Sequence, residues 1–328
     1  MQQKLETLRD IFGVDTIKLT KDELTVGDQH YPIIDDVIIL LNPAEYPASV
    51  RNRLKKTTVL ARESSDFALD IQFTFGQEWQ AFDQIIPEHE QEFKEYFDLI
   101  NLKLMHNQRV CDLGCGSGRW SHFIAPHCRE LILVDFSDAI FVARRNLADN
   151  PNTLFFMADI AQLPFRADFA DFIFCLGVLH HMPDNALMLV RKLSYFAPKL
   201  LVYLYYALDN RPWYFRRILW LTTVLRHQLA RYQNPKGRQC LTTILTLCLY
   251  MPWVLLARLV APLKLDHYVP LSYYQHKTFA RIRQDCYDRF FTRIEQRFSQ
   301  KQILELQDTY SRIQISPHVP YWHFMCER

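Results

Sequence analysis

The chain has 328 residues, of which 49% are hydrophobic, 14% aromatic and 23% charged. This composition is that of a folded protein with a well-packed core, and it excludes an intrinsically disordered or low-complexity chain. The length suits one large α/β domain with additions, or two domains, and the formal net charge of +2 gives the whole chain no strong preference for a charged partner.

The eight cysteines include no CxxC pair, and several of them lie inside apolar, strand-like runs. This spacing argues against a zinc knuckle or a secreted disulfide framework, so we expect no metal site. The first ten residues, MQQKLETLRD, lack the apolar run of a signal peptide. We therefore expect a cytoplasmic protein.

Residues 1–70 predict a small β-rich unit followed by a linker. Apolar and polar residues alternate at 16–19 and 24–26, and a β-branched run follows at 31–37. Residues 42–70 are punctuated by proline and then become basic, which is typical of a linker. We expect this N-terminal unit to serve for docking or packing.

Residues 71–206 predict the core domain. A helix is expected over 87–104, and further helices such as 139–150 and 185–196 lie between apolar runs. Strands that alternate with helices predict a mostly parallel sheet whose ligands bind at the carboxyl ends of the strands. The five strand-like runs are 109–113, 131–134, 154–157, 169–176 and 199–206.

Residues 110–120 read VCDLGCGSGRW and contain three of the eight glycines in the chain. Gly114, Gly116 and Gly118 follow the first strand-like run directly. Glycine is kept where the backbone takes positive φ or approaches another molecule closely. A strand, a glycine turn and a helix N-terminus are typical of a nucleotide site.

The segment 207–285 interrupts this pattern with a basic and apolar insertion. From residue 211 to residue 264 it has nine Lys or Arg and no Asp or Glu, which leaves 29 basic and 36 acidic residues in the rest of the chain. Two helices are expected, at 213–230 and 241–263. After the insertion, residues 286–328 are expected to complete the core sheet.

Four alternatives remain for the insertion: a lid over an acceptor pocket, a contact between two copies of the chain, an element on the membrane surface, and a transmembrane helix. Pro252, Arg258 and three threonines weaken the transmembrane alternative for 241–263. Basic residues gain from anionic lipid and apolar ones from burial, so a helical pair on the membrane surface is physically sound. Long aliphatic residues between the charges disfavour nucleic acid as a partner.

Four motifs resemble those of class I S-adenosylmethionine-dependent methyltransferases. They are DLGCGSG at 112–118, VDFS at 134–137, ADIAQLPF at 158–165 and LGVLHHMPD at 176–184, and they agree in order and spacing. The resemblance is closest to the ubiquinone and menaquinone biosynthesis group. The rival, a NAD-binding domain, has no counterpart of LGVLHHMPD.

The resemblance implies an α/β fold with a Rossmann-like sheet of seven strands, mostly parallel with a C-terminal antiparallel strand, and S-adenosylmethionine as the cofactor. The basic segment described above is expected to add a helical insertion after the fifth strand. The N-terminal unit resembles the zinc-ribbon-like region that precedes many bacterial methyltransferases, although its cysteines are absent here.

The same resemblance assigns roles to the strand ends. Asp135 is expected to accept bonds from both ribose hydroxyls, Asp159 to accept from the adenine amino group, and Gly177 to form the floor beneath the sulfonium. The full set expected to hold the cofactor is Asp112, Gly114, Cys115, Gly116, Gly118, Asp135, Phe136, Asp159, Ile160, Leu176 and Gly177.

His180 and His181 follow the fourth strand, at the mouth of the expected site. An imidazole there could serve as general base for a hydroxyl acceptor, and the alternative is that both residues shape the loop. The sequence thus predicts methyl transfer to an oxygen, less readily a nitrogen or carbon, of a lipid, a lipid-linked glycan or a secondary metabolite. The alternatives are a non-catalytic cofactor-binding scaffold and an RNA methyltransferase. A peripheral contact of 211–264 with the inner face of the membrane and a homodimer are the expected partners.

Overall fold

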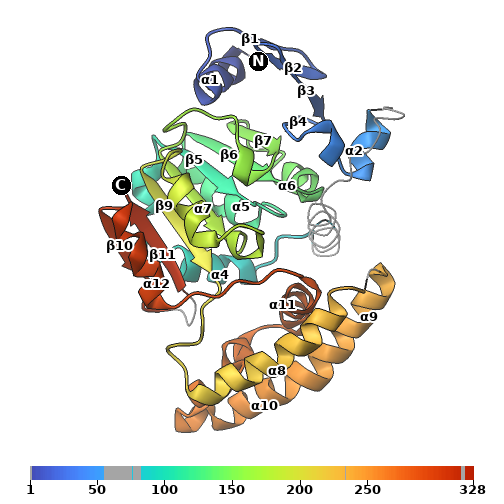
Figure 1. Cartoon of the computed structure of the whole chain (residues 1–328), viewed down its shortest axis with the longest axis vertical. Coiled ribbons are helices and arrows are strands. Elements are labelled where there is room, and N and C mark those ends of the chain that lie inside the picture. The colour runs from blue at the N-terminus through green and yellow to red at the C-terminus, as the bar shows by residue number, and fades with distance from the viewer. Residues whose placement is uncertain (1, 55–75, 77–82, 233, 319–321) are drawn as a thin grey trace. The chain divides into compact units, whose positions relative to one another are not determined.

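The computed structural model describes residues 2–54, 76, 83–232, 234–318 and 322–328. The chain divides into two compact units, which are described separately (Figure 1). Unit 1 comprises Met1–Leu204 and Lys301–Arg328, and unit 2 comprises Tyr205–Gln300. The insertion thus spans 205–300, whereas the sequence predicted 207–285. The predicted boundary at 70 lies outside the described residues.

Unit 1 is built on one sheet, in which the described residues form 11 strands in the order β1-β2-β3-β4-β7-β6-β5-β8-β9-β11-β10. Neighbouring strands from β7 to β9 run parallel, and β11 runs antiparallel between β9 and β10. The predicted seven-stranded sheet with an antiparallel C-terminal strand is confirmed. These strands are β5 (Arg109–Leu113), β6 (Glu130–Asp135), β7 (Thr153–Met157), β8 (Phe172–Leu176), β9 (Lys199–Leu204), β10 (Arg312–Ile315) and β11 (Trp322–Glu327).

The central strands form where the sequence has short, continuous apolar runs. Every residue of β5 and β7 is buried, as expected for a parallel sheet with both faces covered. Helix α6 packs against β6 and β7, and α7 packs against β9. The helices of this part are α4 (Glu88–Tyr96), α5 (Arg119–Ile124), α6 (Ala139–Asn146), α7 (Ala186–Leu193) and α12 (Gln300–Leu304).

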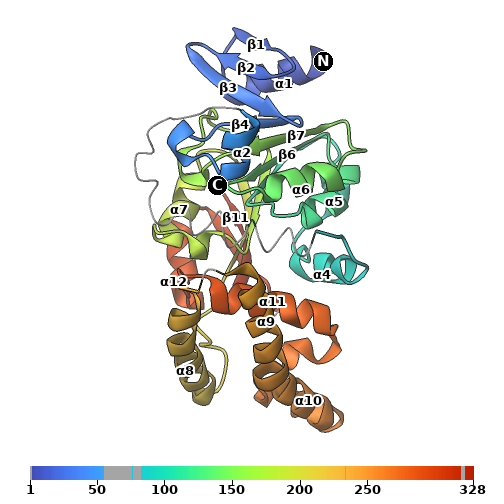
Figure 2. The ribbon, with the colours of Figure 1, turned by 90° about the vertical axis from the view of Figure 1, so that its right-hand side faces the viewer.

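The N-terminal residues extend this sheet rather than forming a separate β unit. Strand β4 (Val37–Ile39) pairs in parallel with β7, and β3 (Gln29–Ile34), β2 (Glu23–Val26) and β1 (Ile17–Leu19) follow outward (Figure 2). The chain begins with a helix that the sequence interpretation missed, α1 (Gln2–Phe12), and a short helix, α2 (Ala48–Arg53), follows β4. The likeness of this region to a zinc ribbon stays unconfirmed.

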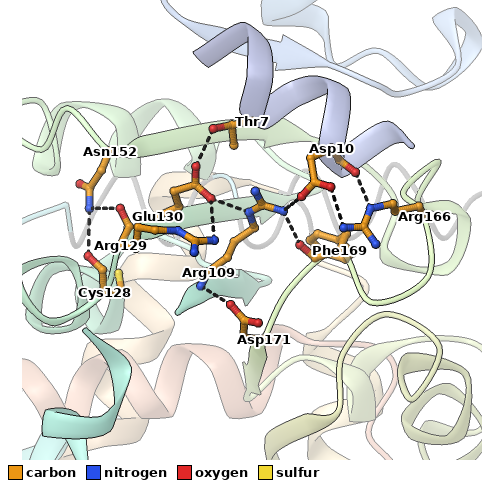
Figure 3. A network of polar contacts seen from close by, with 10 residues as sticks. All are labelled: Thr7, Asp10, Arg109, Cys128, Arg129, Glu130, Asn152, Arg166, Phe169 and Asp171. Atoms are coloured by element: carbon orange, nitrogen blue, oxygen red, sulfur yellow. Dashed lines mark hydrogen bonds and ion pairs between the residues drawn. The ribbon is translucent and has the colours of Figure 1, made fainter. Parts of the chain in front are cut away.

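A buried arginine joins α1 to the amino-terminal ends of two central strands of the sheet (Figure 3). The guanidinium of Arg109, the first residue of β5, donates to Glu130 at 2.7 Å, to the Phe169 carbonyl at 2.9 Å and to Asp10 of α1. The Thr7 hydroxyl of α1 also donates to Glu130, at 2.6 Å. The first helix is therefore fixed to the amino-terminal ends of β5 and β6, away from their carboxyl ends.

Unit 2 is helical. Helix α11 (Phe279–Phe291) packs against both α8 (Trp213–Leu229) and α9 (Pro235–Leu245), and Figure 2 shows the latter two as separate arms. A π-helical turn, Thr246–Tyr250, joins α9 to α10 (Met251–Val260). The core cluster of this unit contains Tyr250 of the π-helical turn and Val254 of α10. From α11 it contains Ile282, Cys286, Tyr287, Phe290 and Phe291.

Candidate active site

The site lies at the carboxyl ends of β5, β6, β7 and β8, where the glycine loop follows β5. The neighbours of β5 are β6 on one side and β8 on the other, so the direction of the strand order reverses here. In open α/β sheets, ligands bind at this reversal, outside the carboxyl ends of the strands. The predicted site residues at these strand ends are therefore brought to one edge of the sheet.

The glycine loop has the backbone that its sequence predicts. Gly114, Gly116 and Gly118 have φ angles of 77°, 54° and 74°, in the left-handed region that favours glycine. A Cβ atom at Gly114 would come within 2.3 Å of the Val178 side chain, and one at Gly118 within 2.7 Å of Leu147. The loop is therefore closely packed against its own chain on one side, and a larger residue would displace it.

Backbone hydrogen bonds hold the loop against β6. The N–H groups of Gly114 and Cys115 donate to the Val134 carbonyl at 2.8 and 3.1 Å. Gly118 is the N-cap residue of α5, so the helix begins directly after the loop. The Cys115 side chain is buried, and burial raises the pKa of its thiol well above the usual value. Cys115 thus supplies backbone to the site, not a reactive thiolate.

Asp135 joins the glycine loop to the turn after β6. One carboxylate oxygen accepts from the Gly116 N–H at 2.9 Å, and the other accepts from the N–H and the hydroxyl of Ser137, both at 2.8 Å. Burial raises the pKa of Asp135, and these hydrogen bonds oppose the rise. Since a carboxylate offers about four acceptor positions, roughly one remains for a ligand. The acceptance of hydrogen bonds from both ribose hydroxyls by Asp135 stays a prediction.

Asp112, near the end of β5, is buried beneath the loop. The Ser121 hydroxyl of α5 donates to its carboxylate at 2.7 Å. Burial raises the pKa of Asp112 to about 8, a rise that the Ser121 hydrogen bond opposes. Ser121 and Ser137 both donate to site carboxylates, and neither is among the residues expected from the sequence to hold the cofactor. The available signal was their position, since Ser137 ends the VDFS motif and Ser121 lies three residues after the DLGCGSG motif.

Asp159 follows β7 and begins a short 3₁₀ turn, 160–162. Its carboxylate accepts from the Ala161 N–H at 2.9 Å, and the side chain is half-buried. Ile160 is buried. One carboxylate oxygen of Asp159 thus caps the turn.

Leu176, Gly177 and Val178 are partly exposed, although the four preceding residues of β8 are buried. Gly177 has a φ of 82°, and a Cβ atom there would meet nothing nearer than Tyr203, at 3.9 Å. Left-handed backbone, not crowding by the protein, therefore requires glycine at this position. Side chains of the protein therefore do not crowd the position directly in front of Gly177.

His180 and His181 lie in a 3₁₀ turn, 179–181, just after this open stretch. Their side chains are 0% and 3% exposed, and their ring centroids lie 4.2 Å apart. The His180 ring also contacts Tyr203, with centroids 5.8 Å apart. Both rings are therefore buried beside each other, and their role as general base stays a prediction.

The accessible positions at this edge form a strip across the four strand ends. Gly114, Phe136, Asp159, Leu176 and Gly177 are partly exposed in a region where their strand neighbours are buried. Residues 110–195, which contain the strip, match the family model of the methyltransferase domain. These residues are therefore similar to a methyltransferase domain.

Two curated relatives are each similar to a part of the chain. The chain is 39% identical over 101 residues to a 23S rRNA (uracil(1939)-C(5))-methyltransferase of Pseudomonas fluorescens, covering 30% of this chain and 22% of the relative. It is 34% identical over 92 residues to a ubiquinone biosynthesis O-methyltransferase of Coxiella burnetii, covering 27% of this chain and 38% of the relative. The chain thus spans well under half the length of each relative.

A solved structure is also similar, that of a putative S-adenosyl-L-methionine-dependent methyltransferase from Methanococcus maripaludis. It is 14% identical with a TM-score of 0.42, covering 77% of this chain and 94% of that one.

S-adenosylmethionine is the cofactor of the class I methyltransferase domain. The residues at the strand ends fit it: the loop glycines have left-handed backbone, no described side chain crowds the position in front of Gly177, and Asp135 keeps about one acceptor position.

Proposed function

We propose that the protein transfers the methyl group of S-adenosylmethionine to an oxygen atom of a lipid, a lipid-linked glycan or a secondary metabolite. A nitrogen or carbon atom of such a compound is the alternative acceptor. The observation that carries the proposal is the accessible strip at the ends of β5 to β8, where Gly114, Asp159 and Gly177 lie on the edge at which such sheets bind ligands.

Each part of the strip has a physical task. The glycine loop lets the backbone approach the cofactor, and the remaining acceptor position of Asp135 suits a hydroxyl hydrogen. A second carboxylate, Asp159, stands two strand ends away from the glycine loop and can accept from an amino group. Gly177 leaves room where a side chain would obstruct the reacting atoms.

The bound cofactor supplies an activated methyl group, so the protein needs to provide mainly positioning. A hydroxyl acceptor must also lose its proton, and a side chain can take it where it comes within hydrogen-bond reach. His180 and His181 are the candidates, because they stand three and four positions after Gly177. Both rings are buried in the structure, so proton transfer to either one requires the acceptor to displace side chains that now cover it.

Two observations support an apolar acceptor and transfer to oxygen. The Coxiella burnetii relative is a ubiquinone biosynthesis O-methyltransferase. Unit 2 also exposes many large apolar side chains, which suits a protein that works with apolar compounds. The chain is also similar to an rRNA methyltransferase, although over only 22% of the length of that enzyme. RNA is therefore the second candidate acceptor.

The test supplies methyl-labelled S-adenosylmethionine and the purified protein to a cell extract that is afterwards divided into lipid, aqueous and RNA fractions. We expect label in the lipid fraction, and much less there with an Asp135→Asn variant at a cofactor concentration that does not saturate it. Label only in RNA would replace the acceptor, and label in no fraction, from protein that binds the cofactor, would favour a non-catalytic scaffold. Failure to bind S-adenosylmethionine in calorimetry would overturn the proposed activity altogether.

A further inference from the structure

Unit 2 exposes an unusual amount of apolar surface. Of the 19 large hydrophobic side chains that are exposed among the described residues, 15 belong to this unit. On α8 they are Trp213, Trp220, Leu221, Val224 and Leu225, which we call the α8 face. On the helix that runs through α9 and α10 they are Ile244, Leu247, Leu255, Leu256, Leu259 and Leu263, which we call the α10 face.

Both faces follow helical spacing. Trp213, Trp220 and Val224 recur at intervals of seven and four, and Leu255, Leu259 and Leu263 recur every four residues, so that each set lies along one stripe of its helix. The opposite sides of these helices pack inward, toward α11. Two apolar stripes thus point away from the core of the unit.

The net positive charge of unit 2 indicates that its partner is anionic. Its 96 residues contain fifteen Lys or Arg and five Asp or Glu, a net charge of about +10 in a chain whose total is +2. Of its acidic side chains only Asp209 is exposed among the described residues, and that carboxylate accepts from the Gln300 N–H. The exposed basic side chains are Arg216, Arg217, Arg231, Lys236, Arg258, Lys264 and Arg293.

We propose that unit 2 docks on an anionic lipid bilayer, with the α8 and α10 faces entering the interface and the exposed basic side chains contacting the headgroups. Apolar stripes flanked by arginine and lysine, with tryptophan and tyrosine at the boundary, are the composition of helices that lie in the membrane interface. Trp213 and Trp220 of α8 and Tyr232 and Tyr268 near the helix ends supply those aromatic rings.

A second copy of the chain fits these faces less well. Two such units would bring about ten positive charges each to one contact, and like charges repel. RNA would match the charge, but it would leave the leucine stripes against a polar backbone. An anionic bilayer matches both the charge and the apolar surface.

The geometry favours docking over spanning. The helix Lys236–Leu263 is long and apolar enough to cross a bilayer, with a mean hydropathy of 1.9 in its most apolar window. Its inner side, however, packs against α11, which has five charged residues among its 13, and the Arg283 guanidinium of α11 donates to Thr243. Moving this pair into hydrocarbon would carry those charges with it.

The buried arginines of the insertion take no part in this contact. Arg226 is 4% exposed and donates to the Thr292 carbonyl, and Arg238 is 0% exposed and donates to the Tyr232 and Ala230 carbonyls. Two of the nine basic residues that the sequence assigned to the segment 211–264 are therefore structural.

The experiment is flotation of the full chain with vesicles of phosphatidylglycerol and phosphatidylethanolamine, compared with phosphatidylcholine alone. We expect flotation with the anionic vesicles and its loss at high salt. The variant Arg216→Glu with Arg217→Glu should weaken binding by more than about fivefold for each arginine. The loss of one basic residue near an anionic leaflet alone contributes roughly that factor, and each new carboxylate is repelled in addition. Trp220→Ser with Leu259→Ser should abolish flotation, because these side chains are 64% and 75% exposed.

The matched control is Lys103→Glu with Leu104→Ser, a basic and an apolar residue exposed on unit 1, which should float like the unaltered chain. Equal flotation of all variants, or none by the unaltered chain, would overturn the proposal. Three other results would also overturn it. Light scattering could show a dimer that only the unit 2 variants disrupt, or the unaltered chain could bind RNA that only these variants fail to bind. The chain could also be released from membranes only by detergent, as a spanning helix would be. Calorimetry with S-adenosylmethionine on the unaltered chain and on the unit 2 variants tests the proposed function separately, because residues 216, 217, 220 and 259 all lie in unit 2 and outside the strand-end site.

Discussion

At the carboxyl end of β6, the Asp135 carboxylate accepts three hydrogen bonds from its own chain, two of them from backbone N–H groups. An amide in its place would turn one acceptor into a donor, which would face the Gly116 N–H or the Ser137 N–H. The loop would lose an anchor at the same time as the ligand lost an acceptor.

We expect Asp135→Asn to weaken S-adenosylmethionine binding by roughly tenfold to a hundredfold, since hydrogen bonds to charged groups contribute about 1.5–3 kcal/mol. Isothermal titration calorimetry measures the change. Asp149→Asn, which removes an exposed carboxyl just after α6, is the control and should bind like the unaltered chain. Equal affinity in both variants would contradict the role of Asp135.

Asp112 predicts a pH dependence of stability. Burial raises its pKa in the folded chain to about 8 from an ordinary value of 3.8. The protonated form is therefore favoured by folding, and the stabilisation is complete below about 3.8 and is lost as the pH rises through about 8. The slope in that window is at most about 1.4 kcal/mol per pH unit.

The variant Asp112→Asn should lack this slope, because its amide does not titrate. Urea denaturation between about pH 5 and pH 9 should show the unaltered chain losing stability faster than the variant. Parallel curves for the two proteins would show that Asp112 stays ionised throughout. Ser121→Ala is a useful companion, since it removes the hydroxyl that donates to the carboxylate and should raise the pKa of Asp112 further.

At the residue scale, the sequence predicts which backbone positions have positive φ, but it does not predict which side chains already have hydrogen-bond partners within the protein. The loop glycines and Gly177 all have positive φ, as their spacing indicates. The occupied acceptors of Asp135 and the burial of Arg226 could not be predicted, because both depend on groups that other segments bring near: the Gly116 N–H in one case and the Thr292 carbonyl in the other.

At the scale of elements, the strands of unit 1 could be predicted closely and the first helix could not. Each central strand is an apolar run that ends at a glycine or an aspartate, so β5 spans 109–113 as expected. Helix α1 has Leu5, Leu8 and Ile11 at helical spacing, but the alternating residues after it favoured strands for the whole segment.

The Arg109 network predicts how firmly α1 is attached. Arg109→Leu would leave Glu130, whose side chain is 16% exposed, without its buried cation. We expect a loss of about 3 kcal/mol in the free energy of unfolding, because removing one partner leaves an uncompensated charge. Denaturant midpoints measure it, and S-adenosylmethionine affinity should not change, since the network lies at the amino-terminal ends of the strands.

The control for this change is Arg129→Leu, which removes a 54% exposed arginine that pairs with the same Glu130 at 3.5 Å. An exposed pair contributes about 0–1 kcal/mol. Similar losses in the two variants would mean that the buried network does not hold α1.

At the scale of the whole molecule, the charges divide as the fold does. Unit 2 has about ten more basic than acidic residues, and unit 1 has about eight more acidic than basic ones. The sequence indicates this division through the acid-free segment 211–264. The sequence does not indicate that acidic residues of unit 2 form ion pairs with its buried arginines.

Glu295 is the clearest of these acidic residues. Its side chain is 4% exposed and pairs with Arg297 at 2.7 Å and with Arg289 at 3.2 Å. Burial would raise the pKa of Glu295, but Arg289, Arg297 and Arg226 together lower it to about 2. The ionised form is thus favoured by folding, with a stabilisation that is present above about 4.5 and is lost as the pH falls toward about 2.

Glu295→Gln should therefore destabilise unit 2 by about 3–5 kcal/mol near neutral pH, because it leaves buried guanidinium groups uncompensated. Hydrogen exchange followed by mass spectrometry should show faster exchange across 205–300, while the strands β5 to β8 keep their protection and S-adenosylmethionine affinity is unchanged. Glu305→Gln, at an exposed carboxyl of unit 1, should alter neither region. Faster exchange throughout both units would mean that they unfold together, and unchanged exchange would mean that Glu295 does not hold the arginine cluster.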